Sequence, residues 1–492
     1  MGDLQGLLSA GVGGSRKKSD FYPNGIQIWG CTMMYPMPYC CRPLGGRKGV
    51  RTMARLRRPY LPLDWEGIED SPDLERVAMV LESLPDEGLM KALEASRPGR
   101  RDVTSVRVKW NMLLAGRVVG HATMNGLLRE LKRNPALRRL VGINPAVGPK
   151  GAPDAHEMSR FWRKLGRRFG GEVDSLRAAA VERLRGHLPD LGEQLGTDTT
   201  ALRTWARGRR DPKKSADPEA DWGRKIRRWK GTDGQLREDV TKWFGYKAHL
   251  LVDTRHELPL ARRVTKASRP DAEKLLEMVR GLKARHPGLS PKSLSADKAH
   301  DDGGLTADLW RQERVRGVFD LRDTAQDGED GERLPGGRNI LLGDDGRVYC
   351  YAKAGHRMIR QAMRPWGFEA DRGTTKYRCP AAALGTACPE RERCGSGPYG
   401  RVVRVKHDMD WRRFGPMARH TKQWKRLCRG RTACERVNAR LKGGMAMDDL
   451  HVRGIRNVTM SLDVAILTLY ALALGHLRRG AKHWRSYTRI AH

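Results

Sequence analysis

The chain has 492 residues and carries 94 Lys and Arg against 57 Asp and Glu, a formal net charge of +37. This length favours two to four domains and disfavours one compact unit. So large a positive excess is typical of a protein that binds a polyanion, above all nucleic acid. A codon bias toward Arg is the alternative, but it would not by itself keep the acidic residues so few.

Residues 1–60 lack hydrophobic periodicity and are rich in Gly, Arg and Met, which predicts a basic, disordered arm. The first residues carry no charged start followed by a long apolar stretch, so no secretory signal is expected. We therefore expect a cytoplasmic, nucleoid-associated protein. A reducing compartment disfavours disulfides among the nine cysteines and makes metal binding the sharper alternative.

Residues 61–170 have the pattern of a helical N-terminal domain. Stretches such as "DLERVAMVLESL" and "VKWNMLLAGRVVGHATMNGLLRELKRN" space their apolar residues by three and four, with basic residues between them. A basic helical face suits DNA binding, although an ordinary solvated helix pair would give the same pattern. Further helices are predicted at 159–169 and 175–188.

From residue 190 the pattern changes to strands that alternate with helices. The predicted elements are, in chain order, an exposed loop at 211–225, strands at 244–253 and 258–265, a helix at 270–285, a short strand ending at Asp297, a helix at 304–313 and a strand at 315–321. This alternation predicts a mixed α/β core, whose first part occupies residues 190–325.

Residues 326–405 interrupt the core with a Gly-, Asp- and Cys-rich insertion in which the sequence suggests no core of its own. Four of its thiols are candidate ligands of a structural Zn²⁺ ion: Cys350, Cys379, Cys388 and Cys394. Their gaps of 28, 8 and 5 residues differ from the usual paired C-x₂-C spacing. Free cysteines in a small apolar patch are therefore the alternative.

Helices resume in residues 406–480, the C-terminal part of the core, and residues 481–492 are a predicted basic tail. The apolar run at 458–477 is just long enough to cross a membrane, but Asp463 and His476 interrupt it. We expect a buried core helix there, with a membrane span as the alternative.

Three acidic residues from distant segments are candidate catalytic metal ligands. Asp198 lies in "GTDTT", Asp297 ends a predicted strand, and Glu435 lies in the basic helix "RTACERVNARLK". Converging carboxylates hold two Mg²⁺ ions about 4 Å apart in phosphoryl-transfer sites. For any one acid alone, a turn or cap residue is the alternative. On a helix, Arg431, Glu435 and Lys442 fall within roughly 40° of one another, more alignment than one ion pair requires.

The stretch "CRGRTACERVNARLK" at 428–442 resembles the C-terminal signature of bacterial insertion-sequence transposases of the DDE type. That signature is Tyr, two residues, Arg, three residues, Glu, six residues and Lys. The chain matches it at Arg431, Glu435 and Lys442 and departs from it at Cys428, where Tyr is expected. "SADKAHDD" resembles the second-acid motif of the family, and the similarity extends over roughly residues 100 to 480.

The resemblance implies a ribonuclease H-like mixed sheet flanked by helices, with a helical N-terminal domain and a cysteine-containing insertion. It implies an enzyme that binds the terminal inverted repeats of an insertion sequence and catalyses DNA cleavage and strand transfer. Asp198, Asp297 and Glu435 would hold Mg²⁺ or Mn²⁺. Arg431 and Lys442 would contact the DNA backbone. A homodimer on double-stranded DNA is expected because two ends are handled together.

Two points stay open. Asp253 in "HLLVDT" also follows a plausible strand, although Asp198 fits the family order better because it precedes the "GYKAH" strand and a hydroxyl residue follows it. Departures from the family motifs at Cys428, Ala299 and His300 leave two alternatives. One is a decayed or domesticated relative that binds DNA without cutting it, and the other is a nuclease that cleaves without joining.

Overall fold

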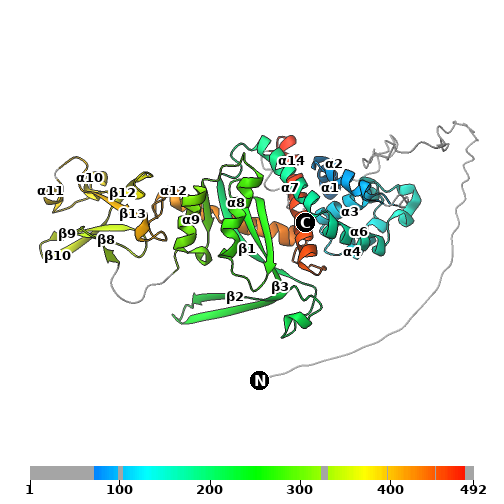
Figure 1. The fold of residues 1–492 in the computed structure, drawn as a ribbon, viewed down its shortest axis with the longest axis horizontal. Helices are drawn as coiled ribbons and strands as arrows, with labels where there is room; N and C mark the ends of the chain where they lie inside the picture. Colours follow the sequence, from blue (N-terminus) through cyan, green and yellow to red (C-terminus); the bar gives the residue numbers. More distant parts are fainter. Residues whose placement is uncertain (1–70, 98–103, 323–330, 396, 449, 482–492) are drawn as a thin grey trace, which may run out of the picture. The chain divides into compact units, whose positions relative to one another are not determined.

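The computed structural model describes residues 71–97, 104–322, 331–395, 397–448 and 450–481 (Figure 1). The arm predicted at 1–60 and all but the first residue of the predicted tail lie outside the described residues. The described chain comprises an N-terminal helical segment, a mixed sheet with flanking helices, an insertion of two small sheets and a C-terminal helical segment.

Helices form the first described segment, as its periodicity predicts. They are α1 Pro72–Ser83, α2 Glu87–Ala95, α3 Val106–Val118, α4 Met124–Arg133, α5 Pro135–Val141, α6 Ala155–Arg168 and α7 Gly170–His187, with a 3₁₀ segment η1 at Pro145–Gly151. Local sequence sets several of the ends. The hydroxyl of Ser105 accepts from the N–H of Val108 at the start of α3. Gly142, with φ of 97°, ends α5 in the left-handed conformation.

A six-stranded mixed sheet follows, made of β1 Gln194–Arg203, β2 Asp221–Lys230, β3 Leu236–Asp253, β4 Leu258–Lys266, β5 Ser293–Ala296 and β6 Arg316–Phe319. Apart from β2, the strands run in the order β4-β3-β1-β5-β6, with β1 antiparallel to β3 and parallel to β5. Helix α8, Leu275–Arg285, connects β4 to β5, and α9, Gly303–Glu313, connects β5 to β6. This is the expected mixed sheet flanked by helices.

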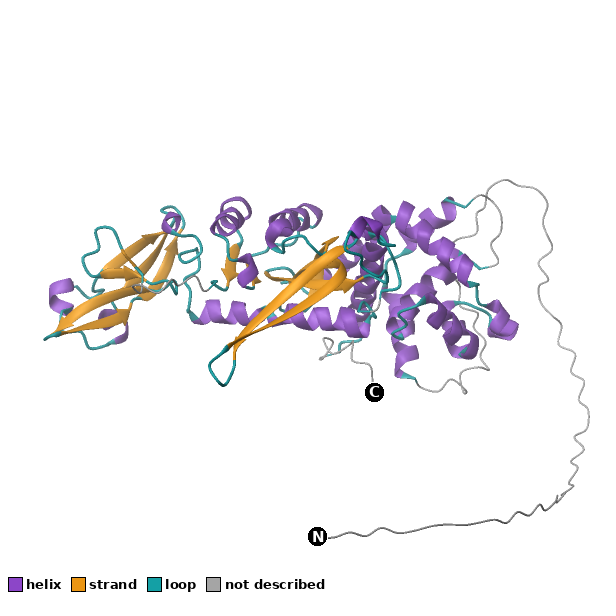
Figure 2. Cartoon of the chain, turned by 90° about the horizontal axis from the view of Figure 1, so that it is seen from below, coloured by secondary structure: helices purple, strands orange, loops and turns teal. Residues whose placement is uncertain are grey.

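The predicted loop at 211–225 is wrong in its last part, because residues 221–225 belong to β2. β2 and the first half of β3 form a two-stranded ribbon that extends beyond the other strands (Figure 2). Both faces of the ribbon are exposed, so its sequence lacks the apolar–polar alternation that marks a half-buried strand. At the base of the ribbon, Gly245 has φ of 153°, and a Cβ there would lie 2.3 Å from the carbonyl oxygen of Leu202.

The insertion folds into two antiparallel sheets. One contains β7 Glu332–Arg333, β8 Ile340–Leu342, β9 Val348–Ala354 and β10 Arg357–Ala362, and the other contains β11 Arg364–Glu369, β12 Thr374–Arg378 and β13 Val402–Lys406. The short helices α10 Pro380–Leu384 and α11 Arg391–Cys394 lie between β12 and β13. The expectation of an insertion without a core is wrong. Apolar side chains from its strands, among them Ile340, Val348, Tyr377 and Val405, pack together with Phe414 from the segment after β13.

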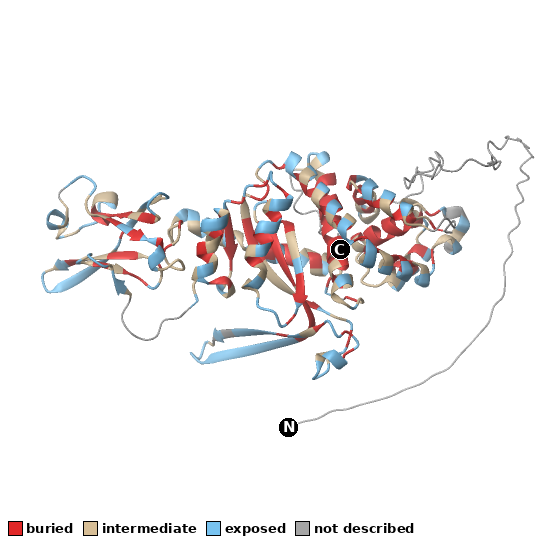
Figure 3. Ribbon diagram, viewed as in Figure 1, coloured by how far each residue is buried: buried red, intermediate tan, exposed pale blue. Residues whose placement is uncertain are grey.

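The C-terminal segment contains α12 Lys422–Gly430, α13 Thr432–Ala439, a π-helical turn at Arg440–Gly444 and α14 Ile455–Arg478. By length and composition α14 could cross a membrane, but 94% of its apolar window is buried within the protein. It packs against α1, α3 and α7 on the helical side and against β4 of the sheet (Figure 3). The expectation of a buried core helix is thus confirmed.

A buried ion cluster joins α14 to the sheet and to α7. Asp463 of α14 is 2% exposed and accepts hydrogen bonds from Arg262 of β4 at 2.8 and 2.6 Å. Arg177 of α7 lies 3.6 Å from the same carboxylate, and Asp174 accepts from both arginines. The helical segment and the sheet therefore share apolar packing as well as buried charge.

Candidate active site

Asp198 in β1 and Asp297 just after β5 lie at equivalent positions along two neighbouring parallel strands. β1 and β5 pair in register from Gln194 with Ser293 to Gly196 with Ser295, and each aspartate follows the last of these pairs by two residues. Asp297, just past the end of β5, is still extended, with φ of −78° and ψ of 179°. Since side chains alternate along a strand, both carboxylates project from the face that carries Gly196.

Helix α13 brings Glu435 to that face. A Cβ added at Gly196 would lie 2.7 Å from Sγ of Cys434 and 2.8 Å from Cγ2 of Thr254, so the helix packs directly on the backbone of β1. Asp198, Asp297 and Glu435 line one cavity of about 720 Å³. The three acids named from the sequence therefore converge, although they come from distant segments of the chain.

The surroundings of Asp198 disfavour its charge. Burial raises the pKa of the carboxyl, and the negative charge of Asp297 raises it further, whereas the positive charges of Lys225 and Arg431 oppose the rise. Nδ2 of Asn438 donates to Oδ2 of Asp198 at 2.7 Å. The two carboxylates repel each other, and a bound divalent cation would relieve that repulsion.

Asp297 is held by the two residues that depart from the family motif. The hydrogen bond from Nδ1 of His300, at 2.9 Å, keeps the pKa of Asp297 below its ordinary value despite its burial. The backbone N–H of Ala299 donates to the same oxygen at 3.1 Å. In the same loop, Asp301 accepts from Nε of Arg412 at 3.1 Å, which ties the loop to the segment that follows the insertion.

Glu435 pairs with Arg431 at 3.2 Å, and its side chain is 58% exposed. Lys442, in the π-helical turn, lines the same cavity and lies 3.1 Å from Asp448. Among the described residues, no three His, Cys, Asp or Glu side chains are close enough together to hold one metal ion. Asp198 and Asp297 supply the oxygen donors that Mg²⁺ prefers, and Glu435 would have to turn away from Arg431 to join them.

Asp253, the alternative first acid, is the last residue of β3. It lies across from Leu195, near the start of β1, and three residue pairs away from Asp198. It is fully buried, and its carboxylate accepts from the backbone N–H groups of Gly192 at 2.7 Å and His256 at 2.6 Å. These hydrogen bonds stabilise the turn between β3 and β4, which gives Asp253 a structural role. It does not line the cavity with Asp297 and Glu435.

Cys428, which replaces the expected Tyr, turns toward the end of β6. Its thiol donates to Oδ1 of Asp320 at 3.3 Å. Burial, followed by this hydrogen bond, raises the pKa of Cys428 to about 11, so the thiol is neutral at physiological pH. Cys428 is not among the residues that line the cavity.

The sequence interpretation missed Asn438 and the basic residues of the ribbon. Asn438 follows Glu435 by three residues, a spacing that places both on one helical face and could have revealed it. Arg224 and Lys225 also line the cavity, but they lie in the stretch that was predicted as a loop. No local signal marked them, because the pairing with β3 is what brings them to the site.

The four insertion cysteines come from β9, the residue after β12, a loop and α11. Burial raises the pKa of Cys350 to about 11, and charges on the other three thiols, Cys379, Cys388 and Cys394, contribute to the rise. The thiols are therefore neighbours in space, although they are not arranged as a closed ligand set.

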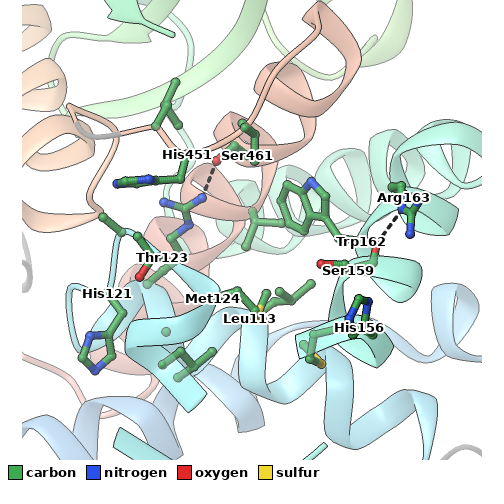
Figure 4. Close-up of a pocket in the computed structure, with 18 residues that line it drawn as sticks. Leu113, His121, Thr123, Met124, His156, Ser159, Trp162, Arg163, His451 and Ser461 are labelled. Carbon is green, nitrogen blue, oxygen red and sulfur yellow. Dashed lines mark hydrogen bonds between the residues drawn. The ribbon is translucent and has the colours of Figure 1, made fainter. Parts of the chain in front are cut away.

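A second cavity, of about 440 Å³, lies among α3, α4, α6 and α14 (Figure 4). Apolar side chains such as Leu113, Met124 and Trp162 form much of its wall, and no Asp or Glu lines it. Arg117 also lines it and donates to the carbonyl of Met445 at 2.8 Å and to the hydroxyl of Ser461. Without carboxylates, this cavity lacks the chemistry of the first one.

The contact between α13 and β1 gives a testable prediction. Replacing Gly196 with Ala places a methyl group within 2.7 Å of Cys434, so the helix that carries Glu435 must shift. We expect Gly196→Ala to destabilise the fold by about 1–3 kcal/mol. We also expect it to slow the DNA cleavage that the resemblance implies about 100-fold, because a displacement of about 1 Å has effects of that size. Urea denaturation and a cleavage assay measure the two effects.

Gly281→Ala is the matched control. A Cβ at Gly281 in α8 meets nothing within 4 Å, so this variant should keep wild-type activity. Equal cleavage rates for the two variants would contradict the direct packing of α13 on β1.

A family model described as a transposase DDE domain matches residues 212–471, more than half of the chain. The matched range contains Asp253, Asp297 and Glu435 and begins after Asp198.

No curated protein matches the chain. Among solved structures, a cryo-electron-microscopy structure of a piggyBac transposase synaptic complex with hairpin DNA is similar at 10% identity and a TM-score of 0.34, over 85% of this chain and 78% of that chain. A similarity of that size adds nothing to the assignment. On the strength of the family match, this chain belongs to the transposase DDE domain family and is a DDE-type DNA transposase.

Proposed function

We propose that this transposase binds the terminal inverted repeats of an insertion sequence, cuts a phosphodiester bond at each end and joins the freed 3′-hydroxyl to target DNA. The observation that carries the proposal is the level placement of Asp198 and Asp297 on neighbouring parallel strands, with Glu435 on the same cavity. Paired carboxylates in a basic protein are what metal-dependent phosphoryl transfer on DNA requires.

In this proposal Asp198, Asp297 and Glu435 hold Mg²⁺ or Mn²⁺. Such ions, when bound, activate the attacking oxygen and stabilise the leaving oxygen. Arg431, released from Glu435, and Lys442 contact backbone phosphates beside the cut and position the strand. We further propose a cytoplasmic, nucleoid-associated homodimer, because the two ends of an element have to be handled together.

The test uses the purified full-length chain, DNA that carries the two ends of its element, and Mg²⁺ or Mn²⁺. The sequence that flanks the gene supplies the ends, as matched inverted repeats. Cleavage at the repeat ends followed by joining to a second duplex would support the proposal. Bound but uncut DNA would favour a relative that has lost catalysis, and cleavage without joining would favour a nuclease.

Burial, together with the negative charge of Asp297, disfavours the charged form of Asp198, which predicts a gain of stability when the carboxylate is replaced by a neutral group. The pKa of Asp198 in the folded protein is raised above 3.8, its ordinary value. Its ionisation therefore lowers the stability of the fold as the pH rises from 3.8 through the raised pKa, and this loss remains at higher pH. In metal-free buffer at neutral pH, Asp198→Asn should therefore have a higher thermal midpoint than the wild type. Asn keeps an oxygen that can accept the hydrogen bond from Asn438. Differential scanning calorimetry in EDTA measures the difference.

Added Mg²⁺ should raise the midpoint of the wild type and leave that of Asp198→Asn almost unchanged, because a cation at the site stabilises the charged form. Thr199→Ala, beside the aspartate, serves as a control that retains the carboxylate. If Asp198→Asn had a lower thermal midpoint than the wild type in EDTA, the charge of Asp198 would not be destabilising and the prediction would be wrong.

We also propose that Cys350, Cys379, Cys388 and Cys394 bind one Zn²⁺ ion, which would favour their thiolates and join the two sheets of the insertion. The mutual electrostatic effect of the four thiols supports this. Purified protein should contain about one zinc per chain by mass spectrometry of the elements. Cys394→Ser should lose the metal and make the insertion sensitive to protease, whereas Cys428→Ser, outside the cluster, should keep it. Metal-free protein that resists protease would show instead that the cysteines form a plain apolar patch.

A further inference from the structure

The β2–β3 ribbon is a large feature for which the proposed reaction provides no role. Residues 221–230 of β2 pair with residues 236–245 of β3 in ten cross-strand pairs. At about 3.3 Å per residue, the ribbon is roughly 30 Å long. Among the described strands, β1 and β4 pair with β3 only from Gly245 onward, so neither covers it. Most of its residues are exposed (Figure 3).

The base of the ribbon forms part of the wall of the carboxylate cavity. Arg224, Lys225 and Thr241 line that cavity together with the three acids. The positive charge of Lys225 is near enough to Asp198 to lower the pKa of its carboxyl. A DNA strand whose phosphate lies at the carboxylates therefore also lies beside the base of the ribbon.

One face of the ribbon carries Lys225, Arg227 and Trp229 at alternate positions. All three are exposed, Trp229 by 41%, and the guanidinium of Arg227 lies 5.6 Å from the centre of the Trp229 ring. Residues 221–230 contain five Lys or Arg against one Asp. Lys225 and Arg227 form no ion pair with any residue that the structure describes. Basic side chains of this kind bind phosphates, and an exposed Trp can stack on bases.

We propose that the ribbon is a DNA clamp that lies in the major groove of the element end being cut. A major groove about 12 Å wide admits a two-stranded ribbon, and the ribbon is close to one helical turn of B-DNA in length, about 34 Å. Lys225 and Arg227 contact backbone phosphates next to the cut. Trp229, roughly 13 Å farther from the cavity than Lys225, packs its ring against base edges in the same groove. The identity of the DNA rests on the proposed function.

The salt dependence of binding tests the phosphate contacts. The full-length chain is titrated in EDTA, where no cutting occurs, with a duplex that carries the element end. Lys225→Gln and Arg227→Gln should each reduce the slope of log K against log salt by about 0.9, the value for one lost phosphate contact. Lys242→Gln removes an exposed charge from the opposite face of the ribbon and should leave the slope unchanged. Equal slopes for all three variants would overturn the clamp.

Trp229→Ala tests the contact between the Trp229 ring and the base edges. It should weaken binding of the end duplex about tenfold to a hundredfold, with the thermal midpoint unchanged, and Trp229→Phe should restore most of the loss. A photoreactive p-benzoylphenylalanine at residue 229 should crosslink to the end duplex within about one helical turn of the cut. No crosslink, or a Trp229→Ala variant with wild-type affinity, would contradict the proposal.

A random-sequence duplex of equal length serves as target DNA, so that binding of the element end and joining to the target are measured separately. If the ribbon variants bind the end normally and lose only joining to the target, the ribbon holds target DNA and the proposal is wrong. A wild-type chain that binds but never cuts refutes the proposed function, and the binding data above still decide whether the ribbon grips DNA.

Discussion

Replacing Asp297 with Asn should abolish DNA cleavage while leaving DNA binding intact. The substitution removes one of two carboxylates that lie level on neighbouring strands, at the point where a cation would bridge them. Loss of a metal ligand removes several kcal/mol of transition-state stabilisation, so cleavage should fall on the order of a thousandfold or more. Asn keeps the shape of the side chain and can still accept from His300. Cleavage of labelled element ends and a gel-shift assay measure the two properties.

Asp198→Asn and Glu435→Gln should show the same loss, because their carboxylates line the same cavity. Asp253→Asn is the matched control: it should lower the free energy of unfolding by about 1–3 kcal/mol, through weakened hydrogen bonds to the buried turn, and retain cleavage. Cleavage that survives Asp198→Asn but disappears with a stably folded Asp253→Asn would identify Asp253 as the first acid.

Replacing Asp463 with Ala should cause a large loss of stability. The change leaves Arg262 without the carboxylate that accepts two of its hydrogen bonds, in a site where Asp463 is 2% exposed. Breaking one partner of a buried ion pair costs about 3–5 kcal/mol. Because Asp174 still accepts a hydrogen bond from Arg262, we expect a loss at the lower end of this range. Urea denaturation of the full-length chain at neutral pH measures the loss as a shift of the midpoint at constant slope.

Asp174→Ala is the control for this cluster. Asp174 accepts from Arg177 and Arg262, but its side chain is 30% exposed, so its removal should cost about 1 kcal/mol or less. Equal losses for the two variants would contradict the central place of Asp463. The comparison also tests whether α14 joins the helical segment and the sheet into one cooperative unit.

Much of the fold could be predicted because its elements obey local rules. Most helices at 72–187 have one buried face, so their apolar side chains repeat with the helical period. The strand residues just before Asp253 and Asp297 are instead buried on both faces and appear as short runs of apolar and small residues. The same rule explains α14, whose apolar run is long because packing surrounds it. Asp297 was recognised because it ends a short, fully buried strand.

The ribbon and the insertion could not be predicted, for two different physical reasons. β2 is exposed on both faces, so no hydrophobic pattern distinguishes it from a loop, and only its pairing with β3 makes it a strand. In the insertion, the short strands β8, β9, β12 and β13 each contribute one or two apolar side chains, such as Ile340 and Val405, to a core that forms only when the strands meet.

In the candidate site, too, some features could be predicted from local sequence and others could not. Arg431 and Glu435 form an ion pair, which the sequence interpretation held as the alternative explanation of their spacing. The sequence interpretation of one continuous helix misses two features, a boundary between α12 and α13 at Arg431 and a π-helical turn that contains Lys442. The preference for Asp198 over Asp253 came from the order of motifs in the family. The register of β1 against β5 and β3 now supplies a geometric reason, because only Asp198 is level with Asp297.

The position of bound Mn²⁺ tests the central claim most directly. Crystals of the full-length chain grown with MnCl₂ and an element-end duplex would locate the ion by its anomalous scattering. We predict an anomalous peak bridging Asp198 and Asp297 at about 2.0–2.2 Å from their oxygens, with Glu435 turned away from Arg431 toward the site. A peak at Asp253, or DNA bound with its cleaved phosphate away from these aspartates, would contradict the account.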